Sequence, residues 1–409
     1  MTTKIIYCAP LFGYPPIGGP ELKVVNVLVA LSNNYQVKLI LWKQVNNPEF
    51  RVFVESRNIE VIYLERSEFK NLKIESRILT GKFLTAYRLI RHRFSFELQR
   101  DRKSIARTIS SVADVYKTKV IWFSYANYFT PQFIALRRNR RNLILIADTD
   151  SVSSRYSLRG LPFVRIRQKI KLARTGLKEV YNEFRLMRYS TILTAVSEID
   201  AKYYSRLKPS VSVAVAYNVV NQSDYELTKI TDAERFIIIT GSFGHFDSPM
   251  DHGTRWFIEN VWPLVRSNHP AVRLRIVGKN SNLVWGNLNQ EGIDVLGWVP
   301  STKPHISSAV ACAVPLWFES GTRYKILEAG ILKTPVVTTT LGAEGLDVKD
   351  GLDLYIADNP DLFALRLSQI LSRGPEIEIC ERLYRKVLDR YSTSHLEEQV
   401  RNIVKTVSS

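Results

Sequence analysis

Two cations at the start of one predicted helix form the most unusual chemical pattern of the chain. The apolar run Ala309–Leu316 predicts a buried strand, 320–322 a loop, and helical spacing begins at Arg323. Arg323 and Lys325 then lie in a first turn that already carries unpaired N–H groups and a partial positive charge. A bound phosphate would make this favourable. Two solvated charges, with Lys325 paired to Glu328 one turn later, explain it equally well.

Other polar and glycine residues also follow predicted strands. Gly18-Gly19 precedes a helix that begins at Pro20, and a spacing unlike GxGxxG argues against simple NAD binding. Asp148-Thr149-Asp150 follows a buried strand, and ligands of open α/β sheets gather beyond the carboxyl ends of strands. These acids are therefore candidate site residues, with capping of the next helix as the alternative.

The elements that position these residues alternate between strands and helices. Strands are predicted at 4–9, 37–42, 59–63, 120–123, 143–147, 191–196, 211–215, 236–239, 273–277, 295–299, 309–316 and 353–356. A polar stretch, Gln222–Arg235, separates two such series. We therefore expect two tandem doubly wound α/β domains facing a cleft, at 1–221 and 222–385, and a helix at 386–409 that returns to the first domain.

Positive charge is concentrated in two segments. The net charge is +18; Lys73–Arg107 has ten Lys/Arg against three Asp/Glu, and Arg155–Arg188 ten against two. Apolar residues interleave with these cations, which is typical of helices at an anionic membrane surface. A basic outer face over a packed inner face is the alternative. Few aromatic residues occur in the second segment, so single-stranded nucleic acid is disfavoured as the partner.

Cellular location is suggested by the cysteines and by the lack of long apolar runs. Cys8, Cys312 and Cys380 form no metal or redox spacing and suggest a reducing compartment. The first residues predict a strand and not a signal peptide, and no run approaches about 18 apolar residues. We expect a cytoplasmic protein, peripheral on the inner face of the membrane.

Motifs of the C-terminal half resemble a known family. GTRYKILEAG at 321–330, PVVTT at 335–339 and GAEGLDVKDG at 342–351 occur in that order. They resemble the donor-binding region of family 4 retaining glycosyltransferases of the GT-B fold (group 1), most closely the branch with the motif GGTRxKILEA. The resemblance spans about residues 236–360, with weaker echoes in GGPE at 18–21, in TAVSE at 194–198 and in the strand that ends near Asn218.

The resemblance implies a role for individual residues. Glu328 would hold the ribose hydroxyls of a nucleotide, and Arg323 and Lys325 the donor pyrophosphate. Further donor-binding positions would be Gly18, Gly19, Gly241, Gly278, Gly297, Val299, Ser320, Gly321, Thr322, Gly342, Ala343 and Glu344. Ser320 stands where many relatives have a glutamate, and Asp150 where many have a histidine. We place Asp150 with Arg323, Lys325 and Glu328 among the catalytic residues.

The implied reaction transfers a hexose from a nucleoside-diphosphate sugar to a glycan or lipid-linked acceptor, with retention, in cell-surface polysaccharide or glycolipid synthesis. No metal and no cofactor is expected. A nucleotide-sugar epimerase on the same fold, a non-enzymatic nucleic-acid-binding protein and an inactive carbohydrate-binding relative remain as alternatives.

Overall fold

The chain forms two compact units. The computed structural model describes residues 3–9, 12–16, 18–64, 102–225, 235–243, 248–288, 291–374 and 376–408. The N-terminal unit consists of Met1–Ser153, Leu177–Ala216 and Leu396–Ser409, and the C-terminal unit of Ser154–Gly176 and Tyr217–His395. Two segments of the first domain expected from the sequence, 154–176 and 217–221, cluster with the C-terminal unit. Residues 396–409 join the N-terminal unit.

A parallel sheet of seven strands forms the centre of the N-terminal unit, in the order β3-β2-β1-β4-β5-β6-β7. Its strands are β1 (Lys4–Ala9), β2 (Gln36–Leu41), β3 (Glu60–Tyr63), β4 (Val120–Phe123), β5 (Ile144–Asp148), β6 (Ile192–Ala195) and β7 (Ser212–Val215). The order changes direction beside β1, and α/β sheets bind ligands at such points. The helical elements are α1 (Gly19–Ser32), α2 (Pro48–Ser56), α4 (Arg102–Tyr116), η2 (Ala126–Phe129), α5 (Thr130–Asn139), α8 (Glu198–Leu207) and the second half of α7 (Ile166–Tyr189).

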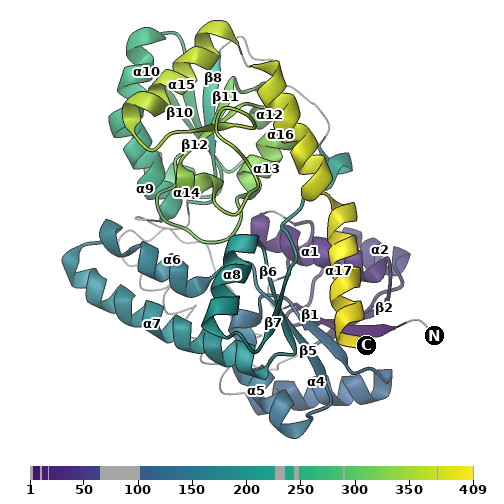
Figure 1. Cartoon of the computed structure of the whole chain (residues 1–409). Coiled ribbons are helices and arrows are strands. Elements are labelled where there is room, and N and C mark those ends of the chain that lie inside the picture. Colours follow the sequence, from purple (N-terminus) through teal and green to yellow (C-terminus); the bar gives the residue numbers. More distant parts are fainter. Residues whose placement is uncertain are drawn as a thin grey trace. The chain divides into compact units, whose positions relative to one another are not determined.

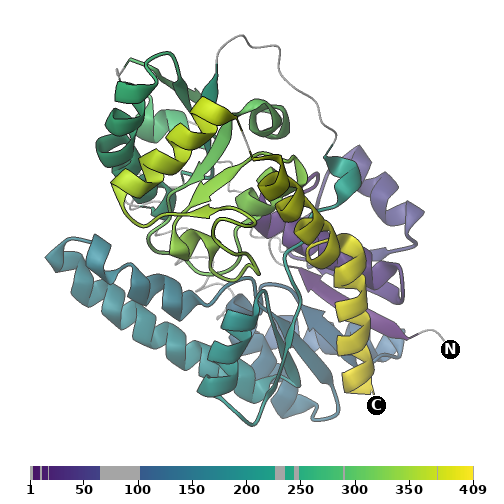
Figure 2. The ribbon, with the colours of Figure 1, turned by 45° about the horizontal axis from the view of Figure 1, so that its top comes forward.

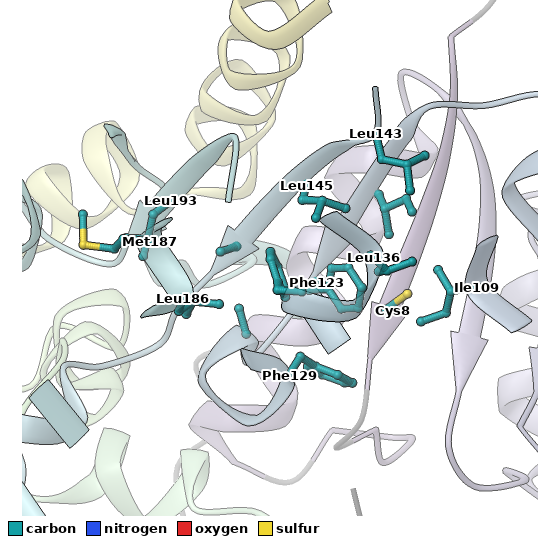
Figure 3. Close-up of a cluster of buried hydrophobic side chains, with 14 of the residues drawn as sticks. Cys8, Ile109, Phe123, Phe129, Leu136, Leu143, Leu145, Leu186, Met187 and Leu193 are labelled. Carbon is teal, nitrogen blue, oxygen red and sulfur yellow. The ribbon is translucent and has the colours of Figure 1, made fainter. Parts of the chain in front are cut away.

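One face of this sheet carries a continuous apolar core. Alternate residues of β1 point to opposite faces: Cys8 joins the core, whereas the hydroxyl of Tyr7 donates to the carbonyl of Val24 in α1. Figure 3 shows Phe123 and Phe129 packed near Cys8. The core is continuous from α4 to α8, which fixes the carboxyl ends of the strands relative to one another.

The C-terminal unit is built on a six-stranded parallel sheet of order β10-β9-β8-β11-β12-β13. Its strands are β8 (Phe236–Thr240), β9 (Arg273–Val277), β10 (Ile293–Gly297), β11 (Ala311–Val314), β12 (Val336–Thr338) and β13 (Tyr355–Ile356). Its helical elements are α6 (Ser153–Arg159), η3 (Leu161–Phe163), the first half of α7, η4 (Gln222–Asp224), α9 (Pro249–Trp256), η5 (Phe257–Val261), α10 (Trp262–Asn268), α11 (Ser281–Trp285), α12 (Lys303–Ser308), α13 (Tyr324–Ile331), α14 (Thr340–Ala343), α15 (Pro360–Arg373) and α16 (Ile377–Arg390). The last helix, α17 (Thr393–Ser408), begins in this unit.

Helices cover both faces of the C-terminal sheet. Figure 1 shows α9, α10 and α15 over one face and α12, α13 and α16 over the other. The turned view of Figure 2 shows the same double covering. A sheet buried on both faces explains why its strands are continuous apolar runs.

The helical stretch that covers one face of this sheet starts with α9 and is interrupted near its middle. It begins at Pro249, where the Ser248 side chain accepts from the N–H of Asp251. Its centre, Phe257–Val261, is a π turn, and α10 follows with Pro263 near its start. Proline has no N–H and clashes with the preceding turn, which accounts for the wider turn there.

Most of the first basic segment lies outside the described residues, since only 102–107 of Lys73–Arg107 is described, at the start of α4. None of the described helices is both long enough and apolar enough to span a bilayer.

Candidate functional site

Three predicted donor-binding glycines meet at the carboxyl ends of neighbouring strands. Gly241 follows β8, Gly278 follows β9 and Gly297 ends β10. The N–H of Gly278 donates to the carbonyl of Gly297 (2.8 Å), and the N–H of Gly241 to that of Val277 (3.1 Å). Gly278 has a φ of +135°, and a Cβ there would lie 1.9 Å from the Gly241 oxygen. Only glycine fits this position, and backbone therefore lines this part of the sheet edge.

Arg323 is buried at the start of α13. It is the residue before the first turn of this helix, and its side chain is 2% exposed. Its Nη2 donates to the carbonyl of Leu341 (3.3 Å), and its Nε lies 3.3 Å from Oε2 of Glu319. Nε and Nη1 have no hydrogen-bond partner among the described residues. A buried guanidinium with unsatisfied N–H groups is costly, and an anion with several oxygens would satisfy it.

Lys325 lies in the first turn of the same helix. Its Nζ is 2.9 Å from Sδ of Met250, and within the described ranges it forms no ion pair with Glu328. Burial lowers the pKa of Lys325; Glu319 opposes this effect and Arg323 adds to it. The explanation by solvated charges therefore loses support, since neither cation is solvated or paired in the way that it requires.

Glu328 lies one turn further along α13. Its Oε1 accepts a hydrogen bond from the hydroxyl of Tyr225 (3.1 Å). Burial raises the pKa of Glu328, and the Tyr225 hydrogen bond, Lys303 and Lys325 limit the rise. Nζ of Lys303 lies 4.5 Å from the centre of the Tyr225 ring. The carboxylate keeps an oxygen that is not used by Tyr225, as an acceptor for hydroxyl groups would need.

Glu344 lies just after α14 and is bound by two arginines. Nη1 and Nη2 of Arg159 are each 2.7 Å from one of its carboxylate oxygens, and Nη2 of Arg155 is 3.3 Å from Oε2. Burial alone would raise the pKa of Glu344, but Arg159, with Arg155 and Arg323, lowers it. Gly342 and Ala343 precede it, and a Cβ at Gly342 would lie 2.1 Å from Oγ1 of Thr338. Close packing of α14 on β12 therefore requires this glycine.

The remaining predicted positions of this unit line the same edge. Ser320, Gly321 and Thr322 form the loop between β11 and α13, and Gly321 has a φ of +85°. Oγ1 of Thr322 is buried and has no hydrogen-bond partner within the described chain. Val299 is half-buried, two residues beyond β10.

Gly18 and Gly19 belong to the N-terminal unit, at the start of α1. Gly18 has an extended backbone (φ 177°), and among the described residues a Cβ there would meet only Pro20, at 3.9 Å. No close approach of backbone therefore demands a glycine at 18, and the predicted contact with a ligand rests on the resemblance.

Asp148 and Asp150 lie at the end of β5, as predicted. Asp148 is 1% exposed, accepts from the hydroxyl of Thr194 (2.6 Å) and lies 3.5 Å from Nζ of Lys23. Lys23 also donates to the carbonyl of Ala216 (2.6 Å). Burial raises the pKa of Asp150 to about 6; Asp148 adds to the rise and Lys23 opposes it. The contacts of Asp148 with Thr194 and Lys23 therefore give this carboxylate a structural role.

No group of three or more His, Cys, Asp or Glu side chains that could hold a metal ion occurs among the residues described.

Sequence reasoning missed four of the residues above. Arg155 and Arg159 were assigned to the basic membrane segment, but they are half-buried and bind Glu344. Lys23 and Tyr225 were missed because the fold brings their partners near from distant parts of the sequence. A buried lysine on the apolar side of α1 is the one feature that could have prompted a search for a carboxylate.

Comparisons with known proteins agree with the fold. Residues 236–373 match the family model "Glycosyl transferases group 1". No curated protein sequence matches the chain. The matched range lies within the C-terminal unit and covers all six strands of its sheet.

Solved structures match along the whole chain. A glycosyltransferase from Rickettsia africae has a TM-score of 0.66 at 12% identity and covers 100% of this chain and 99% of its own. HepE from Anabaena in complex with UDP has a TM-score of 0.63 at 13% identity (99% and 100%), and sucrose-phosphate synthase from Thermosynechococcus elongatus 0.70 at 14% (98% and 98%). Identities this low show the fold alone. The predicted fold, two doubly wound units of the GT-B type, is confirmed.

Proposed function

We propose that this protein is a retaining glycosyltransferase that moves a hexose from a nucleoside-diphosphate sugar to an acceptor hydroxyl. The observation that carries the proposal is Arg323, a buried guanidinium at the start of α13, next to Lys325. Its Nε and Nη1 make no hydrogen bond within the described residues, although Nε lies 3.3 Å from the Glu319 carboxylate. A diphosphate supplies the oxygens that these groups need. The structure of HepE in complex with UDP, which has a similar fold, supports a nucleotide as the ligand.

In the proposed reaction the bond between the anomeric carbon and a β-phosphate oxygen breaks, and the electron pair leaves with the nucleoside diphosphate. The acceptor oxygen forms the new bond on the same face of the sugar. Its proton passes to the leaving phosphate oxygen, which becomes more basic as the bond breaks. Arg323, Lys325 and the N–H groups of α13 stabilise the charge that develops there. Glu328 holds the ribose, and Asp150 stays a predicted catalytic residue.

We propose that this charge stabilisation needs no metal ion, because two cations and a helix N-terminus serve the same phosphate oxygens. Turnover should persist after dialysis against EDTA. Turnover that is lost with EDTA and restored by Mg²⁺ or Mn²⁺ would contradict this part of the proposal.

A thermal-shift screen against UDP, GDP, ADP and their sugars tests the donor, because a ligand that binds only the folded state raises its stability. The positive nucleotide sugar is then incubated with candidate acceptors, and the anomeric configuration of the product is read by NMR. Stabilisation by none of the nucleotides would reject the proposal. A C2 epimer of the free sugar would identify an epimerase, and binding without transfer an inactive relative.

We propose further that helix α7 lies on an anionic membrane surface, which places the enzyme at the cytoplasmic face in polysaccharide or glycolipid synthesis. Four apolar side chains recur on one face of this helix and are 60–79% exposed: Ile166, Ile170, Leu177 and Tyr181. Exposed cations flank them at Arg165, Arg167, Lys169, Lys171, Arg174 and Lys178. The two acids of the helix, Glu179 and Glu183, lie on the other side, and Glu183 is 2% exposed. An apolar stripe bordered by cations matches a bilayer with anionic headgroups.

Vesicles that contain phosphatidylglycerol test this surface. Changing the five cations of 165–174 to Gln should release the protein, at about 1 kcal/mol per cation. The matched control neutralises five exposed cations elsewhere, namely Lys202, Arg206, Arg373, Arg401 and Lys405. Equal binding of both variants would contradict a specific role of α7; an equal loss would indicate non-specific charge attraction.

A further inference from the structure

The segment 154–176 precedes the C-terminal sheet in sequence by a long stretch of chain, yet it belongs to the same compact unit. Aromatic contacts hold it there. The ring of Phe163 stacks on Phe318 (centroids 5.1 Å apart, 17° between planes) and meets His252 edge-on at 4.6 Å. A Cβ at Gly160 would lie 3.5 Å from Phe318. Phe318 is directly before the loop that leads to α13, so this segment is packed against that loop.

Arg159, at the end of α6, joins two loops of the sheet edge. Its guanidinium binds both oxygens of Glu344, and its Nη1 also donates to the carbonyl of Glu319 (3.0 Å). Bidentate pairing fixes orientation as well as distance. A single side chain thus sets the spacing between the loop after β11 and the loop after β12.

Arg323 closes the connection from the other side. Its Nε lies near the Glu319 carboxylate, and its Nη2 donates to the carbonyl of Leu341, three residues before Glu344. The two loops are therefore held by two arginines, of which one has N–H groups left for a phosphate and the other has its guanidinium turned to the protein.

We propose that Arg159 is a positioning residue for the sugar end of the donor: it holds Glu344 and the backbone of Glu319 in the geometry that forms the sugar subsite. The inference rests on the proposed function and adds a residue outside the range of the family match, 236–373. The loops that carry Glu344 and Ser320 would surround the hexose, whereas Glu328 and Arg323 hold the nucleotide and the phosphates. Loss of Arg159 should displace these two loops and therefore affect the binding of the sugar end alone. A displacement of a positioned group by about 1 Å costs roughly 10²-fold in rate.

Isothermal titration of Arg159→Met with a nucleoside diphosphate and with its sugar separates the two ends. The probes are one of three pairs: UDP and UDP-glucose, GDP and GDP-mannose, or ADP and ADP-glucose. The pair that stabilises the wild-type protein is used. We expect the Kd for the nucleoside diphosphate to change less than about twofold, and the Kd for the nucleotide sugar to rise at least about tenfold. Arg159→Lys keeps the charge but not the fork, and should recover part of the loss.

Arg155→Met is the matched control, because it removes the same charge from the same helix and its contacts to Glu344 are longer, 3.3 and 3.4 Å. We expect it to change the Kd for the nucleotide sugar less than about threefold. Unchanged affinity of both Arg159 variants for the nucleotide sugar overturns the inference. Equal loss of affinity for both ligands, or misfolding of Arg159→Met together with normal binding by Arg159→Lys, assigns Arg159 a purely structural role and also overturns it. If no nucleotide binds the wild-type protein, the proposed function fails, and the inference fails with it.

Discussion

Glu328 and Glu344 belong to the same compact unit, but the pKa values of their carboxylates are shifted in opposite directions. Glu328 has a neutral hydrogen-bond donor, Tyr225, and burial raises its pKa. Glu344 has two guanidinium partners, which lower its pKa. Glu328 keeps an oxygen that can accept hydrogen bonds from a ligand, at a cost in stability. Both carboxylate oxygens of Glu344 already accept hydrogen bonds from arginines of the protein. This difference suggests that Glu328 contacts the ligand, while Glu344 shapes the loop around it.

Arg323→Ala should have the largest effect on this comparison. It removes the guanidinium that we place on the pyrophosphate, and loss of one such donor costs about 10²–10³-fold in turnover. The initial rate of transfer from the nucleotide sugar measures this effect. Near-normal rates would contradict the assignment of Arg323 to the pyrophosphate, and with it the ligand roles that we give to the two glutamates.

Glu328→Ala is expected to lower the affinity for the nucleoside diphosphate about 10²-fold, through lost hydrogen bonds from hydroxyls to a charged group. Titration calorimetry measures it, and Glu344→Gln serves as the control, with less than a threefold change. Equal losses in the two variants would contradict the separation of roles.

The pH dependence of nucleotide binding should follow Glu328. Because burial raises its pKa, the carboxylate takes up a proton at a higher pH than the usual value of about 4.3 for Glu, and it then loses its ability to accept two hydroxyls. Affinity should therefore fall up to about tenfold as the pH is lowered through that raised pKa. Glu328→Gln has no such proton and should lack this component, while it keeps any titration of the ligand and of Asp150.

The smallest expected effect concerns the stability that Glu344 contributes. Its folded-state pKa lies below that of the unfolded chain, so its contribution is present above the unfolded pKa and disappears as the pH falls through the lowered value. At pH 7, Glu344→Gln should reduce the free energy of unfolding by about 1 kcal/mol. In urea titrations, the free energies of unfolding of the two proteins should begin to converge as the pH falls below the unfolded value of about 4.3, and should meet below the lowered folded-state pKa. A constant difference across this range would show that the ion pair is not its source.

Much of the architecture could be predicted because it depends on local patterns. Apolar runs that end in glycine located the strands and the loop at Gly278, where the positive φ explains the residue type. The cations of α13 were found because charge at a helix start is locally anomalous. Arg323 nevertheless precedes the helix instead of lying in its first turn, a shift of one residue that spacing does not resolve.

What could not be predicted depends on contacts between distant residues. Arg159 and Glu344 are separated by 185 positions, and the arginine sits in a run of cations that has the composition of a surface helix. Tyr225 lies within the polar stretch 222–235, which has no periodicity, and its sequence neighbours do not indicate a contact with Glu328. Charge and spacing show that a side chain needs a partner, but only the fold identifies it.

The division of the chain into units also has a consequence for its synthesis. The chain passes from one unit to the other at 153–154, 176–177, 216–217 and 395–396. On the ribosome, the segment 154–176 emerges long before α9 and the loops on which it packs, and the N-terminal unit stays incomplete until 396–408 has been made. Neither unit can fold as an uninterrupted piece of nascent chain, so a chaperone that shields Phe163 and its neighbours during translation should raise the yield of native protein.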